Sequence, residues 1–537
     1  MSTPRVKGTR SNAGCLNCRK DRKGCDEEKP DCQRCVRRGH ACVWPEPQHS
    51  SLWPAANGVS AAYSLLPGGR FTTPDLISHP RRNSGDLLHP SPIIEMRLSS
   101  DALLASLPLG IPATQAEREA LAFYHTRPTF GYGNKSPQYS THTIVWRRLL
   151  SNKAVVHLLL AAALAQMGWR DILDWLPDSA ELHYSLGRQE LQKQVVAEGV
   201  DAFTMLTAFW FMYLYQRQRP TPDRGDLSNE VAAYLEHTRL HEIVTSPDEN
   251  PLWPENSKAL TACLLTWLFW ADAQAGTQGK GGGMARLLMQ SGSELVLDLR
   301  EIAKDALRLN WDRYPNSQLV DDIQNSAPFD MIHSIMILGQ EINNRVGDDR
   351  LLRPDASLEI SSKIDNLRRK SAFRAIMHLA MSAEPNRGRM TKNSEWATAL
   401  YFALKVYHFR CGMTAETESF FSTGSNVISQ TVSSMMLLLQ RSLAMNDEGQ
   451  ADRLQLPLFW AGIETTSPIE KTWILSELKH GALNRALRHI YQEQENGRRV
   501  GMARLHQLLD ASCVGLPEMG MGASPGIDTD MDLSMFC

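Results

Sequence analysis

The chain has 537 residues, of which 42% are hydrophobic and 22% are charged, and its formal net charge is −2. This length and this ordinary composition exclude a lone small domain and a chain that is disordered throughout. The small net charge hides an asymmetry, because residues 1–45 carry 11 Lys and Arg against 5 Asp and Glu, whereas the remainder carries 46 against 54. The basic N-terminal segment is therefore expected to meet a polyanion.

Six of the ten cysteines lie close together, between Cys15 and Cys42. The spacing Cys-x2-Cys-x6-Cys occurs in residues 15–25 and again in residues 32–42, so the segment is an internal repeat. The residues before it are polar and basic and lack the apolar run of a secretory signal peptide, which favours a reducing compartment. Clustered thiols in such a compartment indicate a metal site.

The repeat suits two zinc ions held by six thiolates. Zinc prefers four tetrahedral ligands, and six sulfurs fill the eight positions of two ions only when two sulfurs are shared. The first cysteine of each half can reach across to the other metal. Binding would supply on the order of 10 kcal/mol per zinc, enough to fold a segment with almost no hydrophobic core. The predicted ligands are Cys15, Cys18, Cys25, Cys32, Cys35 and Cys42.

The complete pattern, with Asp26 after the third cysteine and Pro30 two residues before the fourth, resembles the binuclear zinc cluster of fungal transcription factors. The resemblance implies that Cys15 and Cys32 bridge two zinc ions. It also implies that a short helix over residues 19–24 points its C-terminal end into the major groove of DNA, over a CGG-like triplet.

Basic side chains of this helix are the expected DNA contacts. The family's base-reading position corresponds to Arg22, and an arginine can pair with O6 and N7 of guanine. Asp21 and Gly24 stand where basic residues are common in the family, which leaves the target triplet open. The phosphate contacts are assigned to Arg19, Lys20 and Lys23.

Two plainer interpretations stand beside this one. The cysteines can form a structural zinc knuckle or a protein-binding site with no role in nucleic-acid recognition. Arg22 can be a solvated surface charge, since base contact depends on docking geometry. The spacing, the repeat and the basic helix together favour DNA binding.

Residues 46–100 contain 7 Pro and 4 Gly with frequent Ser and show weak apolar periodicity, so they are predicted to form a disordered linker. Within them, residues 81–84 read Arg-Arg-Asn-Ser and resemble a basophilic kinase site. Prolines from Pro45 to Pro67 exclude a coiled coil directly after the cluster. Either the protein binds one triplet as a monomer, or the helical region supplies the contact of a homodimer.

From residue 101 to residue 517 the pattern is helical almost throughout. Ser467, Pro468 and Glu470 form a capping box in front of apolar residues that continue to Ile490. The most apolar stretches are too short to cross a bilayer, so we expect buried helices at 154–168, 202–215 and 260–271. One helix face is predicted to consist of Leu227, Val231, Tyr234, Leu235 and Thr238.

Three strings in this region resemble the all-helical fungal-specific transcription factor regulatory domain. They are residues 122–124, 146–150 and 456–464. Their expected role is packing, and no functional residue is assigned to them.

Other candidate motifs fail on their chemistry. His237 and His241 have the spacing of a helical metal pair, but Thr238 replaces the glutamate of a zinc protease, so surface or core histidines are expected. Residues 276–281 lack the spacing and the Ser or Thr of a phosphate loop, which favours a flexible loop between helices. No hydrolase or dinucleotide motif is present, so no enzymatic activity is predicted.

The last residues alternate acidic and apolar side chains, as in disordered activation segments. Leu533, Met535 and Phe536 are then expected to dock in a coactivator groove. The alternative is an ordinary frayed terminus.

Together these observations predict a mostly all-α protein. Its parts are a basic arm (1–14), a binuclear zinc cluster (15–45), a disordered linker (46–100), an all-helical regulatory domain (101–517) and an acidic-hydrophobic tail (518–537). We expect a nuclear DNA-binding transcription regulator that activates RNA polymerase II transcription and controls a metabolic gene set. Its expected partners are double-stranded DNA, coactivators or the general transcription machinery, and a nuclear import receptor, with no membrane. The alternative is an enzyme or small-molecule-binding helical protein with an N-terminal zinc anchor.

Overall fold

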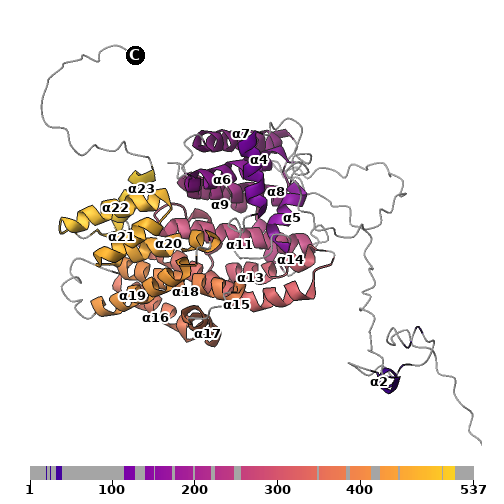
Figure 1. Ribbon diagram of the computed structural model, residues 1–537. Helices are drawn as coiled ribbons and strands as arrows, with labels where there is room; N and C mark the ends of the chain where they lie inside the picture. The colour runs from indigo at the N-terminus through magenta and orange to yellow at the C-terminus, as the bar shows by residue number, and fades with distance from the viewer. Residues whose placement is uncertain are drawn as a thin grey trace, which may run out of the picture. The chain divides into compact units, whose positions relative to one another are not determined.

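The chain divides into two compact units, Met1–Ser60 and Ala61–Cys537. The computed structural model describes residues 18, 20, 25, 32–38, 114–126, 139–149, 152–171, 176–197, 200–218, 224–246, 255–311, 313–347, 350–382, 388–412, 424–445, 448–498 and 500–513. The predicted basic arm, linker and tail lie outside these residues. Every regular element in the described part of the chain is a helix, which confirms the mostly all-α class (Figure 1).

The first unit contributes one described helix, α2 (Gln33–Arg38). The helices of the second unit begin with α4 and run to α23. Those of its first half are α4 (Gln115–Thr126), α5 (Thr141–Leu149), α6 (Lys153–Asp171), α7 (Leu176–Ala197), α8 (Ala202–Gln218), α9 (Arg224–Thr238), α10 (Leu240–Thr245), α11 (Glu255–Thr277), α12 (Gly283–Leu288), α13 (Glu294–Ala303) and α14 (Ala306–Leu309). Those of its second half are α15 (Asn316–Arg345), α16 (Pro354–Arg369), α17 (Ser371–Met381), α18 (Arg389–Cys411), α19 (Gly424–Leu443), α20 (Glu448–Glu464), α21 (Pro468–Glu477), α22 (Gly481–Glu495) and α23 (Met502–Cys513).

Three largely buried helices organise the second unit, and two of them, α6 and α11, are apolar almost throughout. Helix α6 packs against α4, α7 and α8, and α11 packs against α8, α12, α13, α14 and α15. Helix α18 packs against α15, α17, α19 and α20 (Figure 1). A helix without a polar face is stable only when neighbours cover it on every side. The predicted buried helices at 154–168, 202–215 and 260–271 are confirmed as parts of α6, α8 and α11.

A single hydrophobic core runs through the second unit, from Ala116 on α4 to Leu509 on α23. The predicted face of α9 contributes to it, since Leu227, Val231 and Leu235 are buried. Because one core spans both halves, the helices from α4 to α23 form one folding unit.

The predicted cap at Ser467 is present, but the helix behind it is shorter than predicted. The Ser467 hydroxyl accepts a hydrogen bond from the Glu470 amide at 3.4 Å. Helix α21 ends at Glu477, and the apolar pattern continues on the separate helix α22. His480 starts α22, because its Nδ1 accepts a hydrogen bond from the Leu483 amide and its Nε2 donates to the Arg217 carbonyl.

A second capping box, at the start of α4, leads into a buried histidine pair. The Thr114 hydroxyl accepts from the Glu117 amide, and the Glu117 carboxylate accepts from the Thr114 amide at 2.6 Å. The other oxygen of Glu117 lies 2.9 Å from His183 Nε2, and His183 Nδ1 lies 2.9 Å from His157 Nδ1. All three side chains are buried, so this network joins α4, α6 and α7 through satisfied polar groups.

No helix in the described ranges combines the length and the apolarity needed to cross a membrane.

Candidate metal centre and nucleic-acid interface

Four of the six predicted zinc ligands are described, and they lie together in the first unit. Cys18, Cys32 and Cys35 are buried against one another, and Cys25 packs against them half-buried. The Sγ atoms of Cys18, Cys25 and Cys32 all lie within 4.8 Å of one another. Cys18 Sγ and Cys32 Sγ are 3.7 Å apart. The thiols therefore converge on one point, although Cys18 and Cys32 are 14 residues apart in the chain.

This spacing fits thiolates around a zinc ion. Ligands about 2.3 Å from zinc at the corners of a tetrahedron lie roughly 3.8 Å from one another. Disulfide sulfurs would be about 2.05 Å apart, much closer than the 3.7 Å between Cys18 Sγ and Cys32 Sγ. Cys18, Cys25 and Cys32 are thus positioned to hold a metal. Cys15 and Cys42 lie outside the described residues.

Cys32 connects the thiol cluster to helix α2. Its Sγ accepts a hydrogen bond from the Cys35 amide at 3.4 Å, and its carbonyl accepts one from the Val36 amide at 3.1 Å. A side-chain acceptor that binds the third amide of a helix acts as an N-cap. The positive end of a helix stabilises a thiolate in this position. The Cys32 sulfur therefore lies beside Cys18 of the first Cys-x2-Cys pair and also accepts a hydrogen bond from the amide of Cys35, the other cysteine of its own pair.

Of the four predicted DNA contacts, one is described. Lys20 is helical and exposed, two residues after the buried Cys18. Arg19, Arg22 and Lys23 lie outside the described residues. The cluster thus holds the start of the predicted recognition helix on its cysteine side and leaves the lysine in solvent.

Helix α2 carries three further basic residues that the sequence analysis did not select. Arg37 and Arg38 are exposed and Arg34 is half-buried, and α2 has no acidic residue. Arg37 follows the second Cys-x2-Cys pair by two residues, as Lys20 follows the first pair. The internal repeat was therefore a signal that pointed to Arg37.

The strings that resemble a regulatory domain have packing roles in the structure. Arg147 lies 4.6 Å from the centre of the Trp311 ring, and Arg148 donates to the Asn310 side chain at 2.7 Å, so both tie α5 to the region of α14. In the third string, Gly462 allows close packing of α20 on α22, because a Cβ there would lie 2.6 Å from Leu487. These contacts agree with the expected packing role.

The two spaced histidines do not form a metal pair. Arg239 adopts a left-handed conformation with φ 50° and ends α9, so the residues lie on different helices. His237 is exposed on α9 and His241 is buried on α10. The prediction of a single helix through both was wrong, whereas the prediction of surface or core histidines agrees with the exposed His237 and the buried His241.

The glycine-rich loop between α11 and α12 is ordered around a carboxylate. The amides of Gly282 and Ala285 donate to the two oxygens of Asp272, at 2.9 and 2.8 Å, and the Tyr213 hydroxyl donates to the same carboxylate. The Gly283 amide donates to the Ser228 hydroxyl. The loop connects two helices as predicted, and hydrogen bonds to the Asp272 and Ser228 side chains hold its C-terminal end. The amides at the end of the loop and in the first turn of α12 bind the protein's own side chains, whereas a phosphate loop would offer its amides to a ligand.

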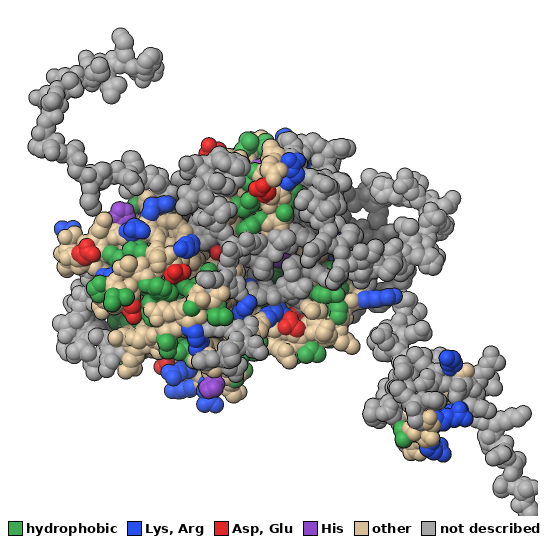
Figure 2. All heavy atoms as spheres, viewed as in Figure 1, with side chains coloured by type: hydrophobic (Ala, Val, Ile, Leu, Met, Phe, Trp, Pro, Cys, Tyr) green, Lys and Arg blue, Asp and Glu red, His purple; other side chains and the backbone are tan. Residues whose placement is uncertain are grey.

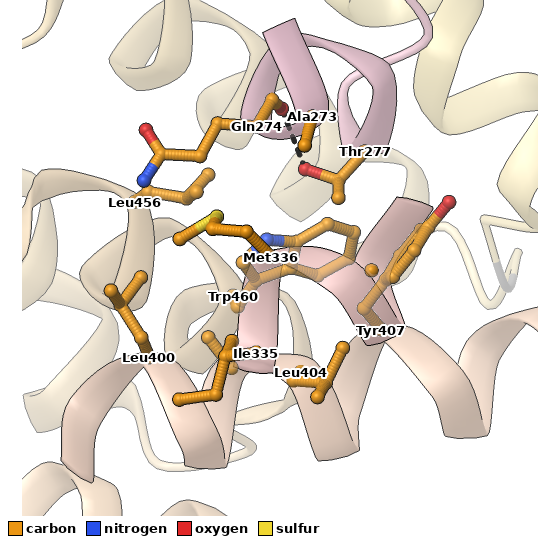
Figure 3. A pocket seen from close by; sticks show the side chains of 12 residues that line it. Ala273, Gln274, Thr277, Ile335, Met336, Leu400, Leu404, Tyr407, Leu456 and Trp460 are labelled. Carbon is orange, nitrogen blue, oxygen red and sulfur yellow. Dashed lines mark hydrogen bonds between the residues drawn. The ribbon is translucent and has the colours of Figure 1, made fainter. Parts of the chain in front are cut away.

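A small apolar cavity lies among α11, α15, α18 and α20 (Figure 3). Its volume is about 30 Å³, and its walls include Met336, Leu404 and Trp460. The Thr277 hydroxyl at its edge donates to the Gln274 carbonyl and is satisfied. A water molecule needs roughly 10–15 Å³ of such space, so this cavity is too small for a metabolite.

Comparison with known proteins places the first unit in a family. Residues 13–51 match the fungal Zn(2)-Cys(6) binuclear cluster domain. Over 42 residues the chain is 52% identical to an uncharacterized transcriptional regulatory protein of Schizosaccharomyces pombe, covering 8% of each chain. It is 50% identical over 42 residues to transcription factor lfc1 of Flammulina velutipes, covering 8% of this chain and 15% of the relative. Over 58 residues it is 36% identical to the fungal-type transcription factor afumD of Aspergillus fumigatus, covering 11% and 16%.

These matches span less than a fifth of each relative, and no solved structure matches the chain. The resemblance of the helical unit to a regulatory domain therefore stays a prediction. The thiol geometry and the matched segment agree on the first unit. The chain carries a fungal Zn(2)-Cys(6) binuclear cluster domain at residues 13–51, with two zinc ions as its cofactor.

Proposed function

We propose that the chain is a zinc-dependent, sequence-specific DNA-binding transcription regulator. The observation that carries this proposal is the convergence of three thiols at zinc-ligand spacing next to the exposed Lys20. Zinc would supply the fold of this unit, because the buried side chains among its described residues are cysteines. The excess of Lys and Arg in residues 1–45 attracts the phosphates of DNA.

The proposed zinc ligands are all six clustered cysteines, with Cys15 and Cys32 as the bridging pair. The position of Cys32 supports this assignment, since its sulfur lies beside both Cys18 and the Cys35 amide. Six thiolates and two Zn²⁺ ions carry a charge of about −2, which neighbouring Lys and Arg side chains offset.

The proposed reader of base pairs is Arg22, over a CGG-like triplet in the major groove. Arg19, Lys20 and Lys23 are proposed to contact phosphates, and the exposure of Lys20 supports its part. Phosphate contacts set the position of the helix, and the arginine then selects the sequence.

The helical unit is proposed to regulate this binding or to supply a homodimer contact. Activation of RNA polymerase II transcription through the tail, coactivator and import-receptor binding, and a nuclear location complete the proposal. The relatives' names are those of transcription regulators, which supports a regulator without enzymatic activity.

A binding assay on the full-length chain tests the proposal. Fluorescence anisotropy with a CGG-containing duplex and a scrambled duplex, with zinc and after chelation, should show a zinc-dependent preference for CGG. Arg22→Ala should cost about 1–3 kcal/mol on the preferred duplex and reduce discrimination. Lys20→Ala should weaken both duplexes alike and reduce the salt slope by about one unit.

Arg313→Ala, at an exposed arginine of the helical unit, is the matched control and should change neither property. Equal binding of both duplexes by the zinc-loaded chain would remove the basis of the proposal. An exchange of the two variant behaviours would show that the roles of Arg22 and Lys20 are reversed.

A further inference from the structure

A basic corner projects from the helical unit where α16 meets α17. It consists of Arg368, Arg369, Lys370 and Arg374, all of which are exposed. No Asp or Glu occurs from residue 366 to residue 382, although acidic residues exceed basic ones in the chain after residue 45. Figure 2 shows Lys and Arg side chains gathered at the lower edge of this unit, where Figure 1 places α17.

A serine lies in the middle of this corner. Ser371 is exposed and follows Arg368 and Arg369 by three and two residues. Its hydroxyl makes no hydrogen bond to any other described residue, whereas the nearby Ser382 hydroxyl donates to a backbone carbonyl. The Ser371 hydroxyl is therefore available at the surface of the described structure.

The packing of the two helices aims this serine at solvent. Leu367 and Phe373 are buried and anchor the end of α16 and the start of α17. Lys370 alone separates the helices, with φ −60° and ψ 127°. Because the apolar side chains point inward on both sides of this break, the residues between them point outward.

We propose that Ser371 is a phosphorylation site for a basophilic protein kinase. The kinase transfers the γ-phosphoryl group of ATP: the bond from the γ-phosphorus to the bridging oxygen breaks, a bond to the serine Oγ forms, and ADP leaves. The hydroxyl proton passes to a carboxylate of the kinase. Acidic pockets of such a kinase recognise the two arginines, since guanidinium groups bind carboxylates through paired hydrogen bonds.

The structure also shows what the phosphate meets once it is attached. Ser371 is the first residue of α17, whose first turn contains no acidic side chain and whose cap makes no side-chain hydrogen bond. Helix amides there lack intrahelical acceptors, and a phosphate of about −2 charge is favourable at this end. The modification lowers the charge of the corner from +4 to about +2.

A kinase needs the residues before the serine in an extended form. Arg368 and Arg369 belong to the last turn of α16, so this turn must open for the reaction. Terminal turns open at much lower free energy than the whole fold. The comparison of folded protein with a free peptide therefore tests the proposal directly.

The experiment treats the full-length chain with the catalytic subunit of cyclic-AMP-dependent protein kinase and Mg-ATP, and maps phosphopeptides by mass spectrometry. All proteins carry Ser84→Ala, which removes the other Arg-Arg-x-Ser string. Phosphate is expected at Ser371. The double variant Arg368→Gln and Arg369→Gln should slow its incorporation about tenfold or more. Ser362→Ala, at an exposed serine of α16 without preceding arginines, should leave the rate unchanged.

A synthetic peptide of residues 364–378 is treated in parallel, and circular dichroism at 222 nm checks that each variant is folded. Phosphorylation of the peptide but not of the folded chain would overturn the proposal, because the folded helical unit would then block access of the kinase to Ser371. Undiminished labelling of the Ser371→Ala variant would overturn it as well, since the phosphate would lie elsewhere. The proposal does not depend on DNA binding by the first unit.

Discussion

The interiors of the two units of this protein are stabilised by different kinds of interaction. In the helical unit, Trp210, Trp270 and Trp460 lie fully buried in a core that runs from α4 to α23. In the N-terminal unit, the described buried side chains are cysteines whose sulfurs face one another. An apolar core stabilises in proportion to the surface that it removes from water, so it needs many residues. A metal supplies comparable free energy from a few ligands, so a short segment can fold. The first unit should depend on zinc and the second should not.

The largest effect is expected when one thiol of the zinc cluster is removed. Cys25→Ala should reduce bound zinc below two ions per chain and unfold the first unit, because each zinc contributes on the order of 10 kcal/mol. Native mass spectrometry measures the zinc, and the thermal transition of the helical unit should not move. Cys263→Ala, at a buried cysteine of α11, is the matched control and should keep both ions. Two ions retained in the Cys25 variant would contradict the proposed ligand set.

The reverse test perturbs the helical unit alone. Phe459 on α20 has no exposed surface, and Phe459→Ala should lower the free energy of unfolding by about 3–5 kcal/mol through lost contacts and a cavity. Urea denaturation followed at 222 nm measures this loss, while the zinc content should stay constant. Leu358→Ala is the control, since Leu358 is 73% exposed and should change stability by less than about 0.5 kcal/mol. A fall in zinc content in the Phe459 variant would show that the units are not independent.

Acid should weaken the helical unit through its buried histidines. His333 accepts a hydrogen bond from Trp270 Nε1 on Nδ1 and donates from Nε2 to the Val296 carbonyl, so its neutral form is the one that fits. Burial lowers the pKa of His333 to about 3. In the unfolded chain the His333 imidazole has an ordinary pKa and binds a proton at a pH where the buried imidazole of the folded chain stays neutral. The contribution of His333 to the free energy of unfolding is therefore fully present above about pH 6.5 and decreases as the pH falls toward 3. Between pH 7 and pH 5 this decrease amounts to about 2 kcal/mol.

Urea denaturation at the two pH values measures this loss. His489→Gln, at an exposed histidine of α22, should leave the difference between pH 7 and pH 5 unchanged. Equal stability at both pH values would contradict a neutral, buried His333.

The smallest effect concerns one cap. Ser467→Ala removes the acceptor for the Glu470 amide and should cost about 1 kcal/mol. Thermal denaturation measures it against Ser476→Ala, an exposed position inside α21 that should be nearly neutral. A larger loss at Ser476 than at Ser467 would show that the cap does not stabilise α21.

Local patterns predicted the features that depend on neighbours in sequence. The repeated cysteine spacing predicted the thiol cluster, because six thiols within 28 residues suit shared zinc ions, and the sulfurs of Cys18, Cys25 and Cys32 do lie together. The apolar residues of α6, α8 and α11 predicted buried helices, because a continuous apolar run too short to cross a bilayer is visible in the sequence itself. The Ser467 cap needed only the adjacent Pro468 and Glu470.

The features that were not predicted depend on tertiary contacts or on uncommon backbone conformations, which local sequence patterns do not show. The break before α22 is held by His480, which donates to the Arg217 carbonyl 263 residues earlier, and no local pattern shows such a contact. The end of α9 requires a left-handed Arg239, a conformation that non-glycine residues seldom adopt. The order of the glycine-rich loop depends on Asp272, which lies one helix turn or more before it and binds two separate amides.

The carboxylate of Asp272 has a consequence for ligand access. Because it is attached to the same chain as the Gly282 and Ala285 amides, it competes with any free phosphate at an effective concentration that dilution cannot lower. A nucleotide phosphate would have to displace the Asp272 carboxylate from these amides. This displacement would also break the hydrogen bond that the Tyr213 hydroxyl donates to Asp272. Mononucleotides are thus kept from the loop because its amides already have an acceptor, and not because of the shape of the loop. Changes in the cellular ATP level should therefore leave the conformation of the loop unchanged.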